Sequence, residues 1–125
     1  LRANPPVVVD VAHNPAGIEA LANTLRACGY ADNTWNVVFG VMADKDASAM
    51  LRALKPLTRS LHISAPNVER ALATATLDSI AAHIGFEPIT SYATIGDATQ
   101  GAMANGPTLI CGSFHVADEA LTLLS

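Results

Sequence analysis

Short runs of β-branched and aliphatic residues alternate with longer helix-like segments along the chain, and this alternation constrains the fold more than any other feature. The first run, residues 7–11, is nearly continuous in valine, which is typical of a strand covered on both faces. Ile18, Leu21 and Leu25 then recur at helical spacing. Parallel strands need crossovers of this length. The pattern therefore predicts an α/β fold: an open, mostly parallel sheet of five to six strands with helices on both faces.

The same alternation predicts where the elements lie. We expect strands at residues 7–11, 35–41, 61–64, 88–92 and 108–111. We expect helices from residue 15 to about 28, from about 44 to 56, at 76–84, at 97–104, and from about 113 towards the end of the chain. Cys28 and Cys111, the two cysteines, are expected to be buried free thiols, since a disulfide framework would need more cysteines.

Composition narrows the class of protein. A chain of 125 residues suits one domain, and 50% hydrophobic with 14% charged residues argues against disorder. Seven basic residues spread along a chain of net charge −4 disfavour nucleic-acid binding. No apolar run is long enough to span a bilayer and no signal-peptide pattern occurs, so we predict no membrane partner and a cytoplasmic location. The opening at Leu1, without an initiator methionine, suggests a chain cut at a domain boundary.

Polar residues gather where the predicted strands end. They are Asp10, His13 and Asn14 after the first strand, Asp44, Lys45 and Asp46 after the second, Asn67, Glu69 and Arg70 after the third, and Ser113 and His115 after the fifth. In an open parallel sheet, ligands bind outside the carboxyl ends of the strands. Four such segments on one edge therefore favour a binding site there.

Each segment also has a purely structural interpretation. Asn14 before a proline starts a helix well in any protein. Asp44 and Asp46 could cap a helix and complement its dipole as readily as they could serve a ligand. Arg70 could be a surface salt-bridge partner, and the Gly-Ser pair that ends in Ser113 could simply turn the chain into a helix.

For three further residues, one interpretation is clearly favoured over the other. Asp10 needs an explanation, because an acid inside a valine run costs free energy to desolvate unless it has a partner. His62 and His83 are predicted to be structural, since one lies in a strand and the other on the outer side of a helix.

Common nucleotide and metal motifs are absent from the sequence. It contains no G-x-x-x-x-G-K-[ST] phosphate loop, no G-x-G-x-x-G fingerprint, no zinc-type Cys/His spacing and no G-x-S-x-G elbow. The sequence thus predicts no metal site, and it predicts ligand-edge residues without the means to bind a triphosphate alone.

Four motifs nevertheless resemble one family. Residues 10–15 (Asp-Val-Ala-His-Asn-Pro), residues 39–46 (Phe-Gly-Val-Met-Ala-Asp-Lys-Asp), the Arg70-Ala71 pair and residues 111–115 (Cys-Gly-Ser-Phe-His) follow in order at fitting spacing. They resemble the C-terminal domain of the folylpolyglutamate synthases, most of all the bacterial bifunctional branch with dihydrofolate synthase activity, in the Mur ligase superfamily. The resemblance covers essentially the whole chain.

The resemblance implies a fold and a chemistry. Residues 1–125 would form a single Mur-ligase-type C-terminal (glutamate ligase) domain, a Rossmann-like three-layer sandwich that lacks the P-loop domain of the whole enzyme. In that family, ATP with Mg²⁺ phosphorylates a carboxylate of dihydropteroate or a folate, and L-glutamate then forms the amide. The N-terminal P-loop ATPase domain is the implied partner, and no cofactor is expected to bind this chain tightly by itself.

The resemblance also implies residue roles. Asp10 would accept hydrogen bonds from the ATP ribose, and His13 would lie near the phosphates or the incoming glutamate as the candidate catalytic residue. Ser113 and His115 would contact the glutamate substrate, although His115 replaces a tyrosine found in other branches.

By the same resemblance, Lys45 and Arg70 would be anion contacts.

Two alternative functions remain open for the chain. A signalling receiver domain of similar length needs an aspartate after its third strand and a lysine after its fifth, whereas these strands are followed here by residues 64–66 (Ser-Ala-Pro) and Ser113. A stand-alone module that binds a small ligand, with Asp10 merely structural, also remains open.

Overall fold

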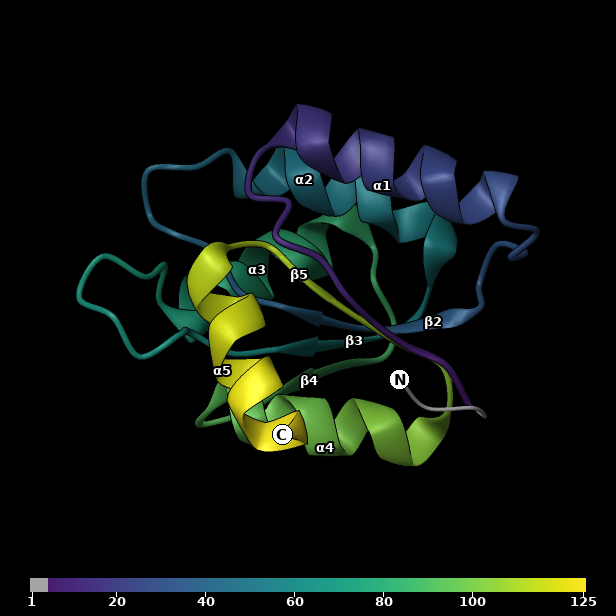
Figure 1. Cartoon of the computed structure of the whole chain (residues 1–125). Helices are drawn as coiled ribbons and strands as arrows, with labels where there is room; N and C mark the ends of the chain where they lie inside the picture. Colours follow the sequence, from purple (N-terminus) through teal and green to yellow (C-terminus); the bar gives the residue numbers. More distant parts are fainter. Residues whose placement is uncertain (1–4) are drawn as a thin grey trace.

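The computed structural model describes residues 5–125, and its centre is one sheet of five parallel strands in the order β1-β5-β2-β3-β4 (Figure 1). The strands are β1 (Val7–Val9), β2 (Trp35–Phe39), β3 (Thr58–Ile63), β4 (Ile89–Ser91) and β5 (Thr108–Cys111). The helices are α1 (Pro15–Ala27), α2 (Ala47–Leu54), the short 3₁₀ helix η1 (Lys55–Leu57), α3 (Thr74–Ile84), α4 (Ile95–Asn105) and α5 (Phe114–Leu124). The predicted α/β architecture is confirmed.

Helices cover both faces of the sheet, with α1, α2 and α3 on one face and α4 and α5 on the other (Figure 1). Alternation along the strands assigns each side chain to a face. On β2, Val37 and Phe39 point to the first face and Val38 points to the second. In the part of the chain described, no helix is both long and apolar enough to cross a membrane.

Local signals explain how α1 begins, but the predicted burial of Cys28 after its last turn was wrong. The Asn14 side chain accepts a hydrogen bond from the Gly17 N–H at 2.8 Å, and Pro15 occupies the first helical position. Cys28 lies at the C-cap and is exposed, whereas Cys111 is buried. The apolar stripe of α1 ends at Leu25, so the last turn extends beyond the core.

Several element boundaries differ from the sequence expectation. The first strand ends at Val9 instead of residue 11, and the second helix begins at Ala47 because Asp46 caps it, accepting from the Ala49 N–H at 3.0 Å. The third strand begins at Thr58 instead of residue 61. In the polar start of this strand, Ser60 is hydrogen-bonded on the second face of the sheet.

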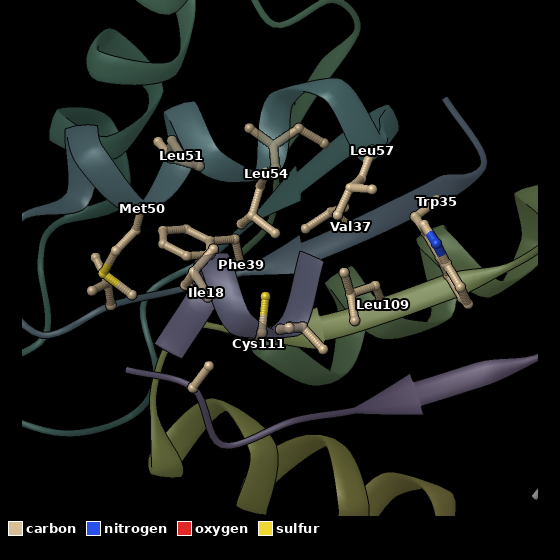
Figure 2. Close-up of a cluster of buried hydrophobic side chains, with 14 of the residues drawn as sticks. Ile18, Trp35, Val37, Phe39, Met50, Leu51, Leu54, Leu57, Leu109 and Cys111 are labelled. Carbon is tan, nitrogen blue, oxygen red and sulfur yellow. The ribbon is translucent and has the colours of Figure 1, made fainter. Parts of the chain in front are cut away.

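Large apolar side chains fill the first face (Figure 2). Those with no exposed surface include Ile18, Trp35, Val37, Phe39, Met50, Leu51, Leu54, Leu57, Leu61, Ile63, Leu77, Leu109 and Cys111. Burying a side chain of this size stabilises the fold by about 1.5–3 kcal/mol.

The second face combines small helix residues with a chain of buried hydrogen bonds. The Ser60 hydroxyl donates to Asn36 Oδ1 at 2.6 Å and lies 2.8 Å from His62 Nε2, while His62 Nδ1 lies 2.8 Å from the Tyr92 hydroxyl. Asn36 Nδ2 donates to the Pro107 carbonyl at 3.0 Å. The Ser60 proton is already used, so Nε2 carries the ring proton and Tyr92 donates to Nδ1. The bonds therefore run in one direction from Tyr92 to Pro107.

Gly101 in α4 makes room for this chain. A Cβ at that position would collide with the Tyr92 hydroxyl. A small residue on the helix thus lets Tyr92 reach His62, and the two rings stack with their centroids 5.7 Å apart.

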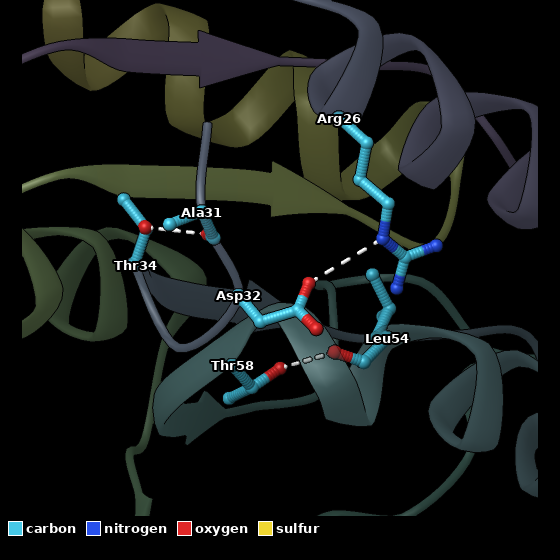
Figure 3. Close-up of polar contacts among 6 residues, drawn as sticks. All are labelled: Arg26, Ala31, Asp32, Thr34, Leu54 and Thr58. Carbon is cyan, nitrogen blue, oxygen red and sulfur yellow. Dashed lines mark hydrogen bonds and ion pairs between the residues drawn. The ribbon is translucent and has the colours of Figure 1, made fainter. Parts of the chain in front are cut away.

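The amino edge of the sheet is held by local polar contacts (Figure 3). Arg26 Nε lies 3.4 Å from Asp32 Oδ1, with side chains 42% and 56% exposed, and such a pair contributes about 0–1 kcal/mol. The Thr58 hydroxyl donates to the Leu54 carbonyl at 2.7 Å where the chain enters β3. The candidate site residues lie at the opposite, carboxyl edge.

Candidate functional site

The ends of β1 and β5 lie side by side, because these two strands are neighbours in the sheet. The Gly112 N–H donates to the Ala12 carbonyl at 3.1 Å, and the rings of His13 and Phe114 lie 5.1 Å apart at an interplanar angle of 34°. The structure thus joins two of the predicted motifs that are about a hundred positions apart in the sequence.

Asp10 has the partner that its position in the valine run required. Its Oδ1 accepts a hydrogen bond from the Ala12 N–H at 2.8 Å, and its own N–H continues the sheet by donating to Ile110. The carboxylate lines an open pocket of about 350 Å³ together with His13 and Asn14. The backbone bond orients the carboxylate and leaves its second oxygen without a partner among the hydrogen bonds of the described residues.

Cys111, at the end of β5, is buried close enough to Asp10 to feel its charge. Burial, and secondly the negative charge of Asp10, raises the pKa of the Cys111 thiol far above its usual range. The thiol therefore stays protonated and packs as a small apolar group.

His13 is held by a backbone carbonyl on one side and an aromatic ring on the other. Its Nδ1 lies 3.2 Å from the Val11 oxygen. A carbonyl only accepts, so Nδ1 carries a proton and Nε2 is the nitrogen left for a ligand. Val11 and Phe114 are 49% and 57% exposed, so an apolar surface surrounds the imidazole.

Ser113 and His115 occupy different positions at the start of α5. Ser113 is 1% exposed, and its oxygen caps the helix by accepting from the Val116 N–H at 3.1 Å. The structural interpretation thus accounts for Ser113, whose hydroxyl proton still has one bond to give. His115 is exposed and lines a second open pocket of about 750 Å³, which Asn67 and Thr94 also border.

Close backbone contacts bring the ends of β5, β2 and β3 together. A Cβ on Gly112 would collide with the Gly40 carbonyl oxygen, and the backbone of Gly112 has φ = +121°, which favours glycine. A Cβ on Gly40 would lie 2.5 Å from the Ser64 oxygen. Only glycine allows these strand ends to pack so closely.

Lys45 and Arg70 come from two loops that are bonded to each other. The Ala43 N–H donates to the Arg70 carbonyl at 2.8 Å, and Met42 pairs with Ala71 in an antiparallel bridge. Within residues 5–125 neither basic side chain has a carboxylate within 4.0 Å. The alternative explanation of Arg70 as a salt-bridge partner is therefore not supported by the structure.

Glu119 is a residue of this region that was not predicted from the sequence. Its Oε2 accepts a hydrogen bond from the Asn67 N–H at 2.7 Å and ties α5 to the loop after β3. Glu119 follows His115 by four positions, which places both on one side of the helix. That spacing was the available signal. Among the described residues, no group of three or more His, Cys, Asp or Glu is arranged to hold a metal ion.

A comparison with known protein families identifies the class of protein to which this fold and the site at the carboxyl ends of its strands belong. The model of the Mur ligase glutamate ligase domain family matches residues 1–114. The chain belongs to this family.

Individual relatives narrow the comparison to folate enzymes. Over 88 residues, 70% of its length, the chain is 39% identical to the dihydrofolate synthase/folylpolyglutamate synthase of Mycobacterium tuberculosis, of which it covers 18%. The chain spans less than a third of the length of the curated relatives that it matches.

Two solved structures share the fold. One is Mycobacterium tuberculosis folylpolyglutamate synthase complexed with ADP and AMPPCP, with a TM-score of 0.89 and 31% identity over 99% of this chain and 30% of that one. The other is Escherichia coli FolC in complex with DHPP and ADP, with a TM-score of 0.80 and 25% identity over 94% of this chain and 28% of that one. The resemblance seen in the four motifs is therefore confirmed at the level of family and fold.

Proposed function

We propose that this chain is the C-terminal lobe of an ATP-dependent amide ligase that adds L-glutamate to dihydropteroate, to folates, or to both through an acyl phosphate. The observation that carries the proposal is the contact between the segment of Asp10 and His13 and the segment after β5 at one edge of the sheet. The names of the relatives, and the ADP complexes of two of them, support it.

The geometry of Asp10 supports a role as a ribose contact. The Ala12 N–H holds one carboxylate oxygen, so the other can accept from a ribose hydroxyl without first being ordered. A hydrogen bond to a charged group contributes about 1.5–3 kcal/mol. His13 presents Nε2 beside the same pocket, where it can donate to a phosphate oxygen when protonated or accept a proton from the attacking amine when neutral.

The amino-acid substrate carries two carboxylates, and the basic residues of the edge suit it. Lys45 and Arg70 are cations on bonded loops without acidic partners in the described region. Ser113 and His115 can each donate one further hydrogen bond towards an anion. We assign these four residues to the glutamate end of the site.

The remaining parts of the chemistry belong to another domain in this proposal. The triphosphate clamp and the Mg²⁺ that neutralises its charge would be supplied by an N-terminal P-loop domain, and the site is complete only when that domain faces the carboxyl edge. Two free thiols fit a reducing compartment, and we propose a cytoplasmic enzyme.

Replacing Asp10 in the full-length enzyme tests the nucleotide role. We expect Asp10→Ala to raise the KM for ATP by about tenfold, in line with one lost charge-assisted bond, and to leave the KM for L-glutamate unchanged. Asp10→Asn keeps an acceptor for the Ala12 N–H, so it separates the ribose role from local folding. Asp78→Ala, at an exposed position of α3, is the matched control. An unaltered KM for ATP in both Asp10 variants would refute the role.

Calorimetric titration of the 125-residue chain with ATP distinguishes the remaining alternative. A ligase lobe that shares its nucleotide with another domain should bind ATP weakly or not at all. Tight binding by the chain alone would favour a stand-alone ligand-binding module.

A further inference from the structure

The loop between β3 and α3, residues 64–73, carries Arg70 and borders the His115 pocket. Its two ends are fixed by backbone bonds to β2 and the segment after it: the Ser64 N–H donates to Phe39 at 3.3 Å and the Leu72 N–H donates to Val41 at 2.8 Å. Together with the bond from the Ala43 N–H to the Arg70 carbonyl, these bonds place both ends of the loop and leave residues 65–69 to be positioned by something else.

One carboxylate positions the middle of the loop. Glu119 Oε2 accepts from the Asn67 N–H at 2.7 Å, across 52 positions of sequence. In the described part of the chain this is the one side-chain hydrogen bond between α5 and the loop. Bonds from an N–H to a carboxylate are shorter and about twice as strong as neutral ones.

Two turns connect Asn67 to Arg70. The Val68 N–H donates to the Pro66 carbonyl at 2.8 Å, and the Ala71 N–H donates to the Val68 carbonyl at 3.2 Å. The Arg70 end of these turns is held by the bond from the Ala43 N–H, so Asn67 is the end that depends on Glu119.

The same carboxylate lies on the side of α5 that bears His115. His115, Glu119 and Asn67 line one pocket, and His115 and Glu119 are one helical turn apart. The helix that presents His115 and the loop that presents Arg70 are therefore joined at a single charged hydrogen bond.

We propose that Glu119 is a positioning residue for the glutamate end of the site: by holding the Asn67 N–H, it fixes the part of the loop that borders the His115 pocket against α5. This inference rests on the ligase function proposed above. Glu119 itself does not contact the substrate in this scheme, because its Oε2 already accepts the hydrogen bond from the Asn67 N–H.

Hydrogen exchange of the Asn67 amide in the 125-residue chain tests the tie without any assumption about function. In Glu119→Ala we expect this amide to exchange about tenfold faster. Glu119→Gln, which retains an acceptor oxygen, should restore part of the protection. Glu19→Ala, at an exposed position of α1, should leave it unchanged. Equal exchange in wild type and Glu119→Ala would overturn the inference.

Kinetics of the full-length enzyme test the consequence. Glu119→Ala should raise the KM for L-glutamate about tenfold while the KM for ATP stays constant and kcat changes by less than about twofold, and Glu119→Gln should recover most of the loss. A fall in kcat with an unchanged KM for L-glutamate would mean that the residue only stabilises the fold, and it would overturn the positioning role. A wild-type enzyme that ligates no glutamate would instead refute the ligase function and the positioning role with it, whatever the exchange result.

Discussion

The face of the sheet under α1, α2 and α3 is packed with large apolar side chains, whereas the face under α4 and α5 carries the hydrogen-bond chain from Tyr92 to Asn36. On the first face, Trp35 Nε1 is the one buried side-chain nitrogen or oxygen of the described residues that has no hydrogen-bond partner. On the second face, the buried Asn36, Ser60 and His62 are all bonded.

The two faces therefore stabilise the same sheet by different interactions. Apolar packing on the first face stabilises the fold in proportion to the area buried and has little directional preference. The hydrogen-bond chain on the second face joins β2, β3, the end of β4 and the residue before β5, so it fixes how these strands sit relative to one another. It contributes less free energy per residue but more geometrical definition.

The largest effect is expected from Leu61→Ala, on the apolar face. Leu61 has no exposed surface, and removing a buried leucine side chain costs about 2–5 kcal/mol because a cavity remains. Denaturant unfolding of the chain measures this loss. The comparison would be broken if Leu61→Ala cost less than a change at its neighbour Ser60.

A smaller effect is expected from Ser60→Ala, on the same strand but the opposite face. The change leaves Asn36 Oδ1 and the His62 Nε2 proton unpaired in a buried place, at a cost of about 1–3 kcal/mol. Tyr92→Phe removes a half-buried donor at the end of the hydrogen-bond chain and should lower the free energy of unfolding by less than Ser60→Ala. Equal stability of Ser60→Ala and wild type would show that the chain of bonds contributes nothing.

The smallest effect is expected from pH. Burial lowers the pKa of His62 below its usual value of 6.5, so the unfolded chain binds a proton before the folded chain does. The stability that the neutral, hydrogen-bonded His62 contributes is fully present above pH 6.5, and it is lost as the pH falls from there through the folded-state pKa. Between about pH 7.5 and about pH 5, the free energies of unfolding of wild type and His62→Gln should converge as the pH falls. A wild-type stability that rose as the pH fell would contradict the assigned proton positions.

The apolar face could be predicted from the sequence, and the polar face could not. The valine run at β1 and the helical stripe of α1 follow simple periodicities, so their placement was correct to within two or three residues. The start of β3 was missed because Ser60 before Leu61 does not match a buried parallel strand. Its burial depends on Asn36, 24 positions away, and a partner that distant leaves no local pattern.

The candidate site shows the same division. Motif spacing identified Asp10 and His13, and the strand order then placed them beside the segment after β5. Sequence reasoning did not show that Ser113 is buried or that Glu119 holds the Asn67 N–H. Both facts depend on how a loop and a helix dock, which a single sequence does not encode in any short pattern.

The position of β1 at the edge of the sheet has a consequence for biosynthesis. Among the strands of residues 5–125, its one partner is β5, with Val7 opposite Thr108. A ribosome makes β1 long before β5, so a valine-rich strand waits without its neighbour until nearly the whole domain has emerged. During that interval the strand is open to pairing with other nascent chains, and the later arrival of β5 both completes the sheet and removes that hazard.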